Sequence, residues 1–349
     1  MAVAELGTDG TYTMHMPLPP LPPLVPATSE APSEIQRLIA QLHQEYAALD
    51  DGAVATYIPE LSKADPAKFG ICLVTADGRV AEAGDCDEPF TIQSISKPFT
   101  YGLAIEEWGH DKVFRHVGVE PSGDAFNSIE LHPGSTRPYN PMINTGAIAV
   151  SGLLYARHGE AALEQMLTRF SQLAGRRLSI DEDVYRSERS TGHRNRAIVH
   201  LLLNCGVVEG DAEAALDLYF RQCSVLVTCR DLAIMAATLA NMGRNPLTGV
   251  SAFDLTSVKD VLSIMFTCGM YDYSGQWAYR VGVPAKSGVS GGVMAVVNRQ
   301  LGIGTYSPRL DQYGNSCRGI AACEAMASRL GLHVFDCLNV GSSYLTAVL

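Results

Sequence analysis

The sequence lacks the features that mark membrane, secreted and metal-binding proteins. Its 349 residues contain no run of 18 apolar residues, which argues against a membrane-spanning helix. The first residues do not join a charged stretch to an apolar one, so we expect no secretion signal and a cytoplasmic location. The cysteines form no CxxC pair, so we expect buried thiols in a reducing compartment, with no metal site and no cofactor. They are Cys72, Cys86, Cys205, Cys223, Cys229, Cys268, Cys317, Cys323 and Cys337.

Basic residues are also in short supply. The chain has 26 lysines and arginines against 37 aspartates and glutamates, for a formal net charge of −11. An acidic surface repels nucleic acid and anionic membranes, so we expect neither as a partner. With 47% hydrophobic residues the composition is that of an ordinary globular protein, for which a small molecule is the expected partner.

Residues 1–33 form a proline-rich segment that contains the run MPLPPLPPLVP. Proline lacks a backbone N–H and favours polyproline II, so we expect a flexible or extended tail here. Such a run can also serve as a ligand for a proline-binding module, although spacers are the commoner use. We expect a folded catalytic domain over residues 34–335 and a short C-terminal tail over 336–349.

Helix and hairpin signals divide the folded part into two lobes. Ser33 can cap a helix in which Ile35, Leu38, Ile39, Leu42 and Tyr46 share one face. The pair Asp77-Gly78 predicts a β-hairpin, and GGVMAVVNRQLGIGTYSP predicts a second one. Between them, residues 98–270 show mainly helical periodicity. We therefore expect an α+β fold, with an antiparallel sheet flanked by the terminal helices, a mainly helical lobe, and a ligand site between the two lobes.

The stretch FTIQSISKPFTYG, residues 90–102, places Ser94 and Lys97 on one helical turn, followed by Pro98. A Ser-x-x-Lys spacing also occurs by chance on solvent-exposed helices. Here the neighbours of Lys97 are apolar, so desolvation favours the neutral amine, which can take the proton of the Ser94 hydroxyl. The N-terminus of the helix supplies N–H groups for an oxyanion. The triplet Lys286-Ser287-Gly288 precedes a predicted strand, as in serine acyl-transfer enzymes with an SxxK helix.

Ten ordered strings together resemble the serine-dependent glutaminase family over about residues 34–332. They are YIPEL, TADG, FTIQSISKP, EPSGDAFN, PYNPMINTGAI, SERSTGHRN, CSVLVTC, MAATLANMG, CGMYDYSGQWA and PAKSGVSGG. The resemblance implies the β-lactamase/transpeptidase-like fold and hydrolysis of L-glutamine to L-glutamate and ammonia. It also implies a homo-oligomer, because relatives form dimers or tetramers.

The resemblance implies catalytic roles for five residues. Ser94 matches the nucleophile and Lys97 the base that activates it. Tyr271 matches the tyrosine that relays a proton to the leaving ammonia, and Tyr57 matches a tyrosine that lines the same site. The backbone N–H groups of Ser94 and Val289 match the oxyanion hole.

Four further residues match the family's substrate contacts: Asn144, Glu188, Asn195 and Tyr219. An amino acid presents an ammonium group, which requires an anion such as Glu188, and a carboxylate, which requires neutral or donor groups. Each asparagine also fits a capping or turn role. Between Glu188 and Asn195, Gly192 favours a loop.

Two other functions fit part of the sequence. A serine β-lactamase or D,D-peptidase shares the SxxK and KSG elements but requires export to meet its substrate. A non-catalytic amino-acid-binding protein on the same fold predicts the loss of a catalytic position, whereas Ser94, Lys97 and Tyr271 are all present.

Overall fold

The computed structural model describes residues 3–6, 12–15, 33–122 and 129–336. The chain divides into two units, residues 1–32 and 33–349. In the first unit, β1 (Val3–Leu6) and β2 (Tyr12–His15) form an antiparallel pair. The sequence had predicted only a flexible or extended tail there. The proline-rich run and residues 337–349 lie outside the described residues, so both predicted tails stay predictions.

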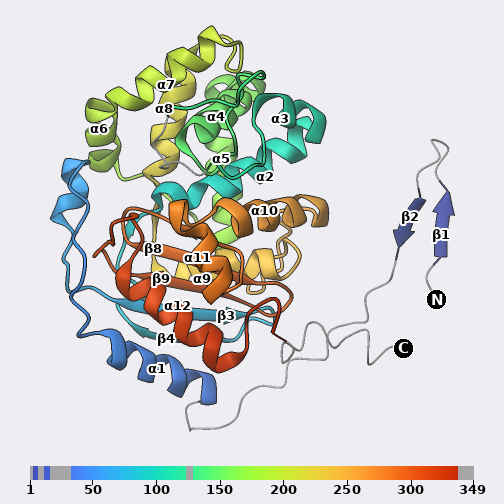
Figure 1. Ribbon diagram of the computed structural model, residues 1–349. Helices are drawn as coiled ribbons and strands as arrows, with labels where there is room; N and C mark the ends of the chain where they lie inside the picture. The colour runs from blue at the N-terminus through green and yellow to red at the C-terminus, as the bar shows by residue number, and fades with distance from the viewer. Residues whose placement is uncertain (1–2, 7–11, 16–32, 123–128, 337–349) are drawn as a thin grey trace. The chain divides into compact units, whose positions relative to one another are not determined.

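A five-stranded antiparallel sheet is the framework of the second unit (Figure 1). Its strand order is β4-β3-β9-β8-β7. The bounds are β3 (Gly70–Thr75), β4 (Val80–Gly84), β7 (Ala285–Ser287), β8 (Gly292–Val297) and β9 (Leu301–Tyr306). Both predicted hairpins are confirmed as β3–β4 and β8–β9. Gly78 turns the first hairpin with a φ of +88°, which a glycine adopts without strain.

Side chains of the sheet alternate between two hydrophobic cores, as the pleat of a strand requires. Ile71 and Leu73 of β3 belong to one core, and Cys72 and Val74 of the same strand belong to the other. Because both faces are buried, the central strands read as continuous apolar runs such as GVMAVV in β8.

The terminal helices cover one face of the sheet, as predicted. The helix α1 (Glu34–Tyr46) packs on β3 and β4, and α12 (Cys317–Leu330) packs on β8, β9 and α1 (Figure 1). The Ser33 hydroxyl accepts a hydrogen bond from the Gln36 N–H at 3.1 Å, which confirms the predicted cap. The helix α11 (Ser274–Arg280) adds the buried Trp277 to this core.

The other face of the sheet is covered by α9 (Cys229–Ala240), which packs most closely on β9. Two glycines of β9 permit this approach. A Cβ on Gly302 would lie 2.1 Å from the Ala237 nitrogen, and a Cβ on Gly304 would lie 2.4 Å from the Cys229 carbonyl oxygen. The helix therefore rests directly on the backbone of the strand.

Further helices form the predicted helical lobe above α9 (Figure 1). Its longer elements are α2 (Lys97–Trp108), α3 (His110–His116), α4 (Asn144–His158), α5 (Ala162–Ala174), α6 (Glu182–Thr191), α7 (His193–Asn204), α8 (Ala212–Cys223) and α10 (Leu255–Cys268). Short 3-10 turns are η1 (Pro59–Lys63), η2 (Gln93–Ser96), η3 (Gly159–Ala161) and η4 (Tyr271–Tyr273).

Two features of the range 98–270 differ from a simple helical lobe. It contains α9, which packs on the sheet. It also contains the strand β6 (Leu226–Val227), which pairs with β5 (Phe90–Thr91) just before the Ser94 turn. The prediction of a loop between Glu188 and Asn195 is wrong, because both residues are helical and Gly192 only separates α6 from α7.

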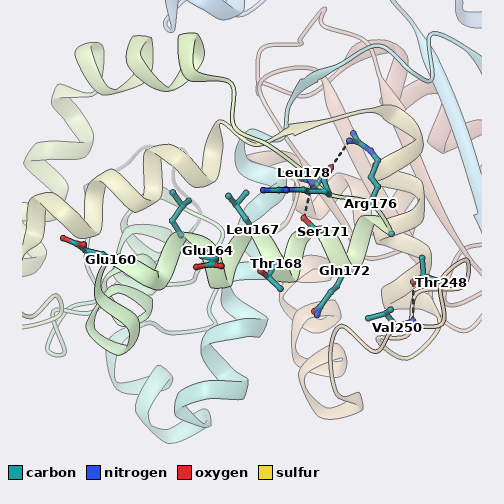
Figure 2. A pocket seen from close by; sticks show the side chains of 13 residues that line it. Glu160, Glu164, Leu167, Thr168, Ser171, Gln172, Arg176, Leu178, Thr248 and Val250 are labelled. Carbon is teal, nitrogen blue, oxygen red and sulfur yellow. Dashed lines mark hydrogen bonds between the residues drawn. The ribbon is translucent and has the colours of Figure 1, made fainter.

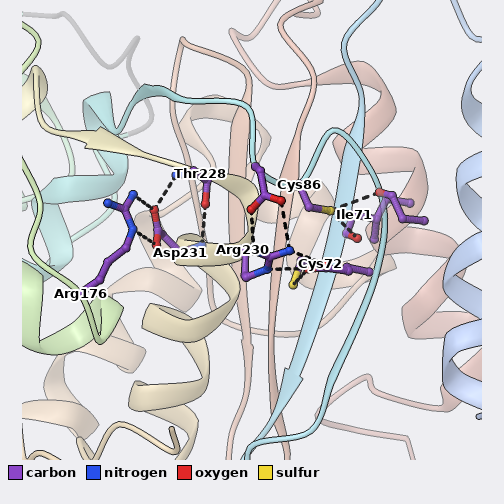
Figure 3. A network of polar contacts seen from close by, with 10 residues as sticks. Ile71, Cys72, Cys86, Arg176, Thr228, Arg230 and Asp231 are labelled. Carbon is purple, nitrogen blue, oxygen red and sulfur yellow. Dashed lines mark hydrogen bonds and ion pairs between the residues drawn. The ribbon is translucent and has the colours of Figure 1, made fainter. Parts of the chain in front are cut away.

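Ion pairs fix the N-terminus of α9 between the two lobes (Figure 3). Arg176 binds the buried Asp231, which also closes a capping box with Thr228. The residue directly before Asp231, Arg230, pairs with Glu82 of β4 and with Asp87. These contacts join α9 to the sheet edge on one side and to the segment after α5 on the other.

The close approach of α9 to β9 predicts a sharp difference between two glycine substitutions. Gly302→Ala places a methyl group against backbone atoms that cannot move aside, so the free energy of unfolding should fall by at least about 2 kcal/mol. Gly275→Ala on the exposed surface of α11 meets no atom within 4 Å, and should leave that free energy unchanged or raise it by up to about 1 kcal/mol. Urea denaturation of both variants measures the difference, and equal stabilities would contradict the packing argument.

Candidate active site

The turn that carries Ser94 lies between β5 and α2. Ser94 is buried in η2, and Lys97 is the first residue of α2. Pro98 follows at a position where its missing N–H removes no intrahelical hydrogen bond. Gln93, directly before Ser94, has a φ of +48°, a left-handed conformation that is strained for a residue with a Cβ. The backbone at the serine is therefore held in an unfavourable shape by its surroundings.

The amine of Lys97 is almost fully buried, with 1% of the residue exposed. It donates hydrogen bonds to the Asn144 side-chain oxygen at 2.7 Å and to the Met142 carbonyl at 3.2 Å. Burial lowers the pKa of Lys97 to about 8, although the nearby Cys223 and Glu188 act in the opposite direction. A substantial fraction of this amine is therefore neutral near neutral pH and can accept a proton.

Tyr271 lies on the other side of the serine. Its side chain is hydrogen-bonded to that of Ser94, and its hydroxyl donates to the Ser287 carbonyl at 3.0 Å. Burial raises the pKa of Tyr271, so the phenol keeps its proton. Tyr271 has a φ of +54°, so a second residue beside the serine is held in a left-handed conformation.

A second buried lysine lies against the ring of Tyr271. Lys286 of β7 donates to the Ser287 carbonyl at 2.7 Å, and its nitrogen lies 4.1 Å from the centre of the Tyr271 ring. Burial lowers the pKa of Lys286 well below its usual value, and the charge of Lys97 adds to this effect. Lys286 and Ser287 of the KSG triplet thus lie on the edge strand β7, Gly288 follows that strand, and the Lys286 amine lies against the Tyr271 ring.

A cavity of about 150 Å³ opens in front of the serine. Its lining includes the predicted residues Tyr57, Ser94, Asn144, Glu188, Asn195 and Tyr219. Lys97 and Tyr271 join it through their hydrogen bonds to Asn144 and Ser94. Val289 packs against Ile58 and Tyr271 in the turn between β7 and β8. Within the described residues, the Val289 N–H donates to no acceptor.

Polar groups from three helices meet on the far wall of this cavity. Asn144 begins α4, Asn195 lies in α7 and Tyr219 in α8. The Asn144 amide donates to the Asn195 oxygen at 3.2 Å and the Tyr219 hydroxyl donates to the Asn144 oxygen at 3.1 Å. Neither asparagine caps a helix, because the cap positions before α4 and α7 are Ile143 and Gly192.

Glu188 of α6 is the acidic group of the cavity. It is buried, and its Oε2 atom has no hydrogen-bond partner among the described residues. Burial raises the pKa of Glu188 to about 8, against the opposing effects of Lys97 and the Gln93 side chain. Once it is ionised, this buried carboxyl group offers a free oxygen that is suited to receive a cationic group such as an ammonium.

Sequence reasoning missed other residues of this cavity. Gln93, Cys223 and Arg194 also line it. Gln93 could have been suspected from its place beside the serine, but nothing in the sequence marks Cys223, which enters the cavity because it lies one helical turn after Tyr219. Tyr57, 55% exposed, stands at the rim before η1.

A larger hollow of about 810 Å³ runs along α5 (Figure 2). Glu164, Leu167 and Thr168 project from that helix, Glu160 lies in η3 just before it, and Arg176 and Val250 lie farther along. None of the described residues that line it is a lysine. Its serine, Ser171, accepts a hydrogen bond from the Leu178 N–H at 3.0 Å and caps the local backbone. The smaller cavity at Ser94 is therefore the candidate active site.

No group of three or more histidine, cysteine, aspartate and glutamate side chains among the described residues could hold a metal ion. No helix in the same part of the chain is both long and apolar enough to cross a lipid bilayer.

Comparison with known proteins decides the family. The Glutaminase family profile matches residues 52–335, which is most of the chain. The chain belongs to the glutaminase family. A glutaminase from Nostoc sp. is 53% identical over 311 residues, which cover 89% of this chain and 93% of that protein.

Solved structures agree with this assignment. The native form of Mglu superposes with a TM-score of 0.85 at 45% identity, covering 89% of this chain and 75% of that one. A probable glutaminase from Bacillus subtilis, complexed with 6-diazo-5-oxo-L-norleucine, has a TM-score of 0.79 at 35% identity, covering 88% of this chain and 100% of that one.

Family membership makes the chain a hydrolase of L-glutamine and confirms the α+β, β-lactamase-like fold expected from the sequence. The antiparallel sheet, the flanking terminal helices and the helical lobe are the parts of that fold.

The pKa values of Lys97 and Glu188 predict how activity depends on pH. The neutral amine of Lys97 and the carboxylate of Glu188 both become more abundant as pH rises through about 8. We expect kcat/KM for glutamine to rise from neutral pH and level off above that range, because this parameter reports ionisations of the free enzyme. An ammonia-release assay at saturating and limiting glutamine measures the profile. A flat or falling profile between about pH 6.5 and 9 would contradict the expectation.

Loss of the Glu188 charge should weaken substrate use without removing the pH dependence due to Lys97. Glu188→Gln should lower kcat/KM by about tenfold to a hundredfold, the scale of one charge-assisted hydrogen bond. Glu182→Gln, an exposed change on the same helix α6, is the matched control and should stay within about twofold. Equal kcat/KM values for the two variants would argue against a substrate contact at Glu188.

Proposed function

We propose that this glutaminase hydrolyses the side-chain amide of L-glutamine through an acyl-enzyme on Ser94, with Lys97 as the base. The observation that carries the proposal is a buried amine of lowered pKa three residues after a buried serine, at the edge of a cavity. A desolvated lysine is an effective general base because its neutral form is populated near the working pH.

In the first half of the reaction, Lys97 accepts the Ser94 proton as the hydroxyl oxygen attacks the amide carbon. The oxyanion that forms is stabilised by the N–H groups of Ser94 and Val289. Such donors contribute on the order of 2.7–4 kcal/mol to the barrier in comparable enzymes. Support for Val289 comes from its place in the turn after β7, beside Tyr271.

In the second half, the nitrogen leaves as ammonia after a proton reaches it through Tyr271. The raised pKa of this phenol keeps its proton in place until the leaving nitrogen takes it, and the proton that Lys97 took from Ser94 then restores the phenol. Water then attacks the glutamyl ester, and L-glutamate leaves. Tyr57 lines the cavity entrance in this scheme.

Substrate orientation comes from the far wall of the cavity. We assign the substrate ammonium to Glu188, whose free carboxylate oxygen is the acidic acceptor there. The carboxylate is assigned to the amide and hydroxyl donors of Asn144, Asn195 and Tyr219. Fixing both α-groups holds the side-chain amide at the serine, and such orientation accelerates reaction.

The cellular location and the oligomeric state of the enzyme are also proposals. The eight cysteines of the described residues are free thiols and most are buried, which is compatible with the reducing cytoplasm. By family resemblance we propose a homo-oligomer, dimer or tetramer. Light scattering on the purified chain should give a multiple of its 37.5 kDa mass, and a strictly monomeric mass at micromolar concentration would contradict this.

Removal of the serine hydroxyl tests the mechanism. Ser94→Ala should reduce ammonia release from glutamine by about a thousandfold or more, because no other group can form the acyl-enzyme. Ser190→Ala, an exposed serine on α6, is the matched control and should keep wild-type activity. Peptide mass spectrometry after treatment with 6-diazo-5-oxo-L-norleucine should find an adduct on the Ser94 peptide of the wild type only.

Nitrocefin distinguishes the second candidate function. The SxxK turn and the edge-strand triplet on β7 are shared with β-lactamases, so a slow nitrocefin hydrolysis is the specific observation that would favour that function. We expect glutamine turnover and no nitrocefin turnover. If Ser94→Ala hydrolyses glutamine as fast as the wild type, the serine mechanism is wrong.

A further inference from the structure

A chain of buried hydrogen bonds runs from α4 to the serine turn. The Ser151 hydroxyl donates to the Gln222 side-chain oxygen at 3.2 Å. The Gln222 amide nitrogen donates to the Ser96 hydroxyl at 2.9 Å, and that hydroxyl donates to the Gln93 carbonyl at 2.6 Å. Ser151, Ser96 and Gln222 have no exposed surface, so no solvent competes for these bonds.

The chain ends on the most strained residue of the turn. Gln93 has the left-handed φ of +48°, and a conformation of this kind costs on the order of 1–3 kcal/mol unless its surroundings impose it. Because Gln93 directly precedes Ser94, rotation of its peptide plane would move the serine oxygen. The Ser96 hydroxyl holds that plane by its carbonyl, and Gln222 fixes the direction in which the hydroxyl points.

The same three side chains lie on three elements that each supply a group to the cavity. Ser96 is in η2 with Ser94, Ser151 is in α4, which begins with Asn144, and Gln222 is in α8, which carries Tyr219. The hydrogen bond between Gln222 and Ser96 therefore links α8 directly to the turn that carries Ser94. The side chain of Gln93 is separately held, since it donates to the Thr91 hydroxyl at 3.2 Å.

We propose that Gln222 is a positioning residue for the hydrolysis of glutamine, which acts through Ser96 on the Gln93 carbonyl and so aligns the Ser94 hydroxyl. The proposal rests on the proposed role of Ser94 as nucleophile. Gln222 does not line the cavity and has no contact with substrate in this scheme. Its effect belongs to the chemical step, while substrate binding depends on groups fixed by other contacts.

Kinetic constants of purified Gln222→Leu and Ser96→Ala test the proposal. We expect kcat to fall by about tenfold to a hundredfold, the scale of a misplacement of about 1 Å at a reacting group, with KM within about threefold of the wild type. Thr238→Val is the matched control. It removes an equally buried hydroxyl of α9 that donates to the Leu173 carbonyl of α5 and the Ile234 carbonyl of α9, so it should lower stability and leave kcat unchanged.

The double variant Gln222→Leu/Ser96→Ala separates positioning from stability. Ser96→Ala leaves the buried Gln222 amide without its acceptor, and the double variant removes that amide as well, so its melting temperature should fall by less than the sum of the two single-variant shifts. The kcat value should stay at that of Ser96→Ala, because the Gln93 carbonyl still lacks its donor. If the double variant has a higher kcat than Ser96→Ala, or if both single variants keep wild-type kcat, the proposal is overturned.

The variant Gln222→Glu tests the same proposal with a side chain of nearly the same volume as glutamine. The introduced carboxyl can donate to Ser96 only while protonated, and burial raises its pKa. We expect kcat to fall on the alkaline side, where the wild type is most active. The melting temperature is measured at each pH to show that the variant is still folded where kcat falls. A wild-type profile would overturn the proposal. Ser94→Ala is run in parallel: if it is active, the nucleophile assignment fails, whereas an inactive Ser94→Ala beside a fully active Gln222→Leu refutes only the role of Gln222.

Discussion

The site is built on the exclusion of water from a lysine amine. Lys97 lies where the helical lobe closes over the sheet, and its hydrogen-bond partners Asn144 and Met142 come from the start of α4. Burial of an ammonium ion is unfavourable, so its proton is held weakly. The nearby Cys223 and Glu188 limit this effect at Lys97, while the charge of Lys97 helps to lower the pKa of Lys286. The packing of the two lobes therefore determines the charge state of the base.

Backbone strain accompanies this burial. Gln93 and Tyr271, on either side of the serine, both adopt left-handed conformations although neither is glycine. Conformations of this kind persist only where the surrounding structure outweighs their cost. Here the surroundings are the two hydrophobic cores and the hydrogen bonds to Ser96 and to the Ser287 carbonyl. The strained conformation of the serine turn therefore offsets part of the free energy that stabilises the fold.

Local chemistry made much of this arrangement predictable. The Ser33 cap, the Asp77-Gly78 turn and the alternation of the β8–β9 hairpin are each decided by neighbouring residues, and each is confirmed. The Ser94 and Lys97 pair was visible for the same reason, since one helical turn relates them. Their apolar neighbours indicated that the amine would be buried.

Features decided by distant contacts were not predictable in this way. Periodicity shows that α9 is apolar, but not that Gly302 and Gly304 open a place for it on the sheet. Gly192 suggested a loop, whereas packing against Phe220 keeps helices on both sides of it. Cys223 and Gln222 became relevant only through the position of α8. An isolated sequence specifies which face is apolar and leaves open which element covers it.

The order of strands in the sheet has a consequence for how the chain folds. The hairpin β3–β4 forms from adjacent residues, yet its inner strand pairs with β9, which is made only after the whole helical lobe. Until then β3 presents an unpaired hydrogen-bonding edge, which is a template for pairing with other chains. Contacts of such long sequence separation also slow folding. During synthesis on the ribosome β3 therefore stays unpaired on this side until β9 has been made, and association with other chains can compete with folding over that interval.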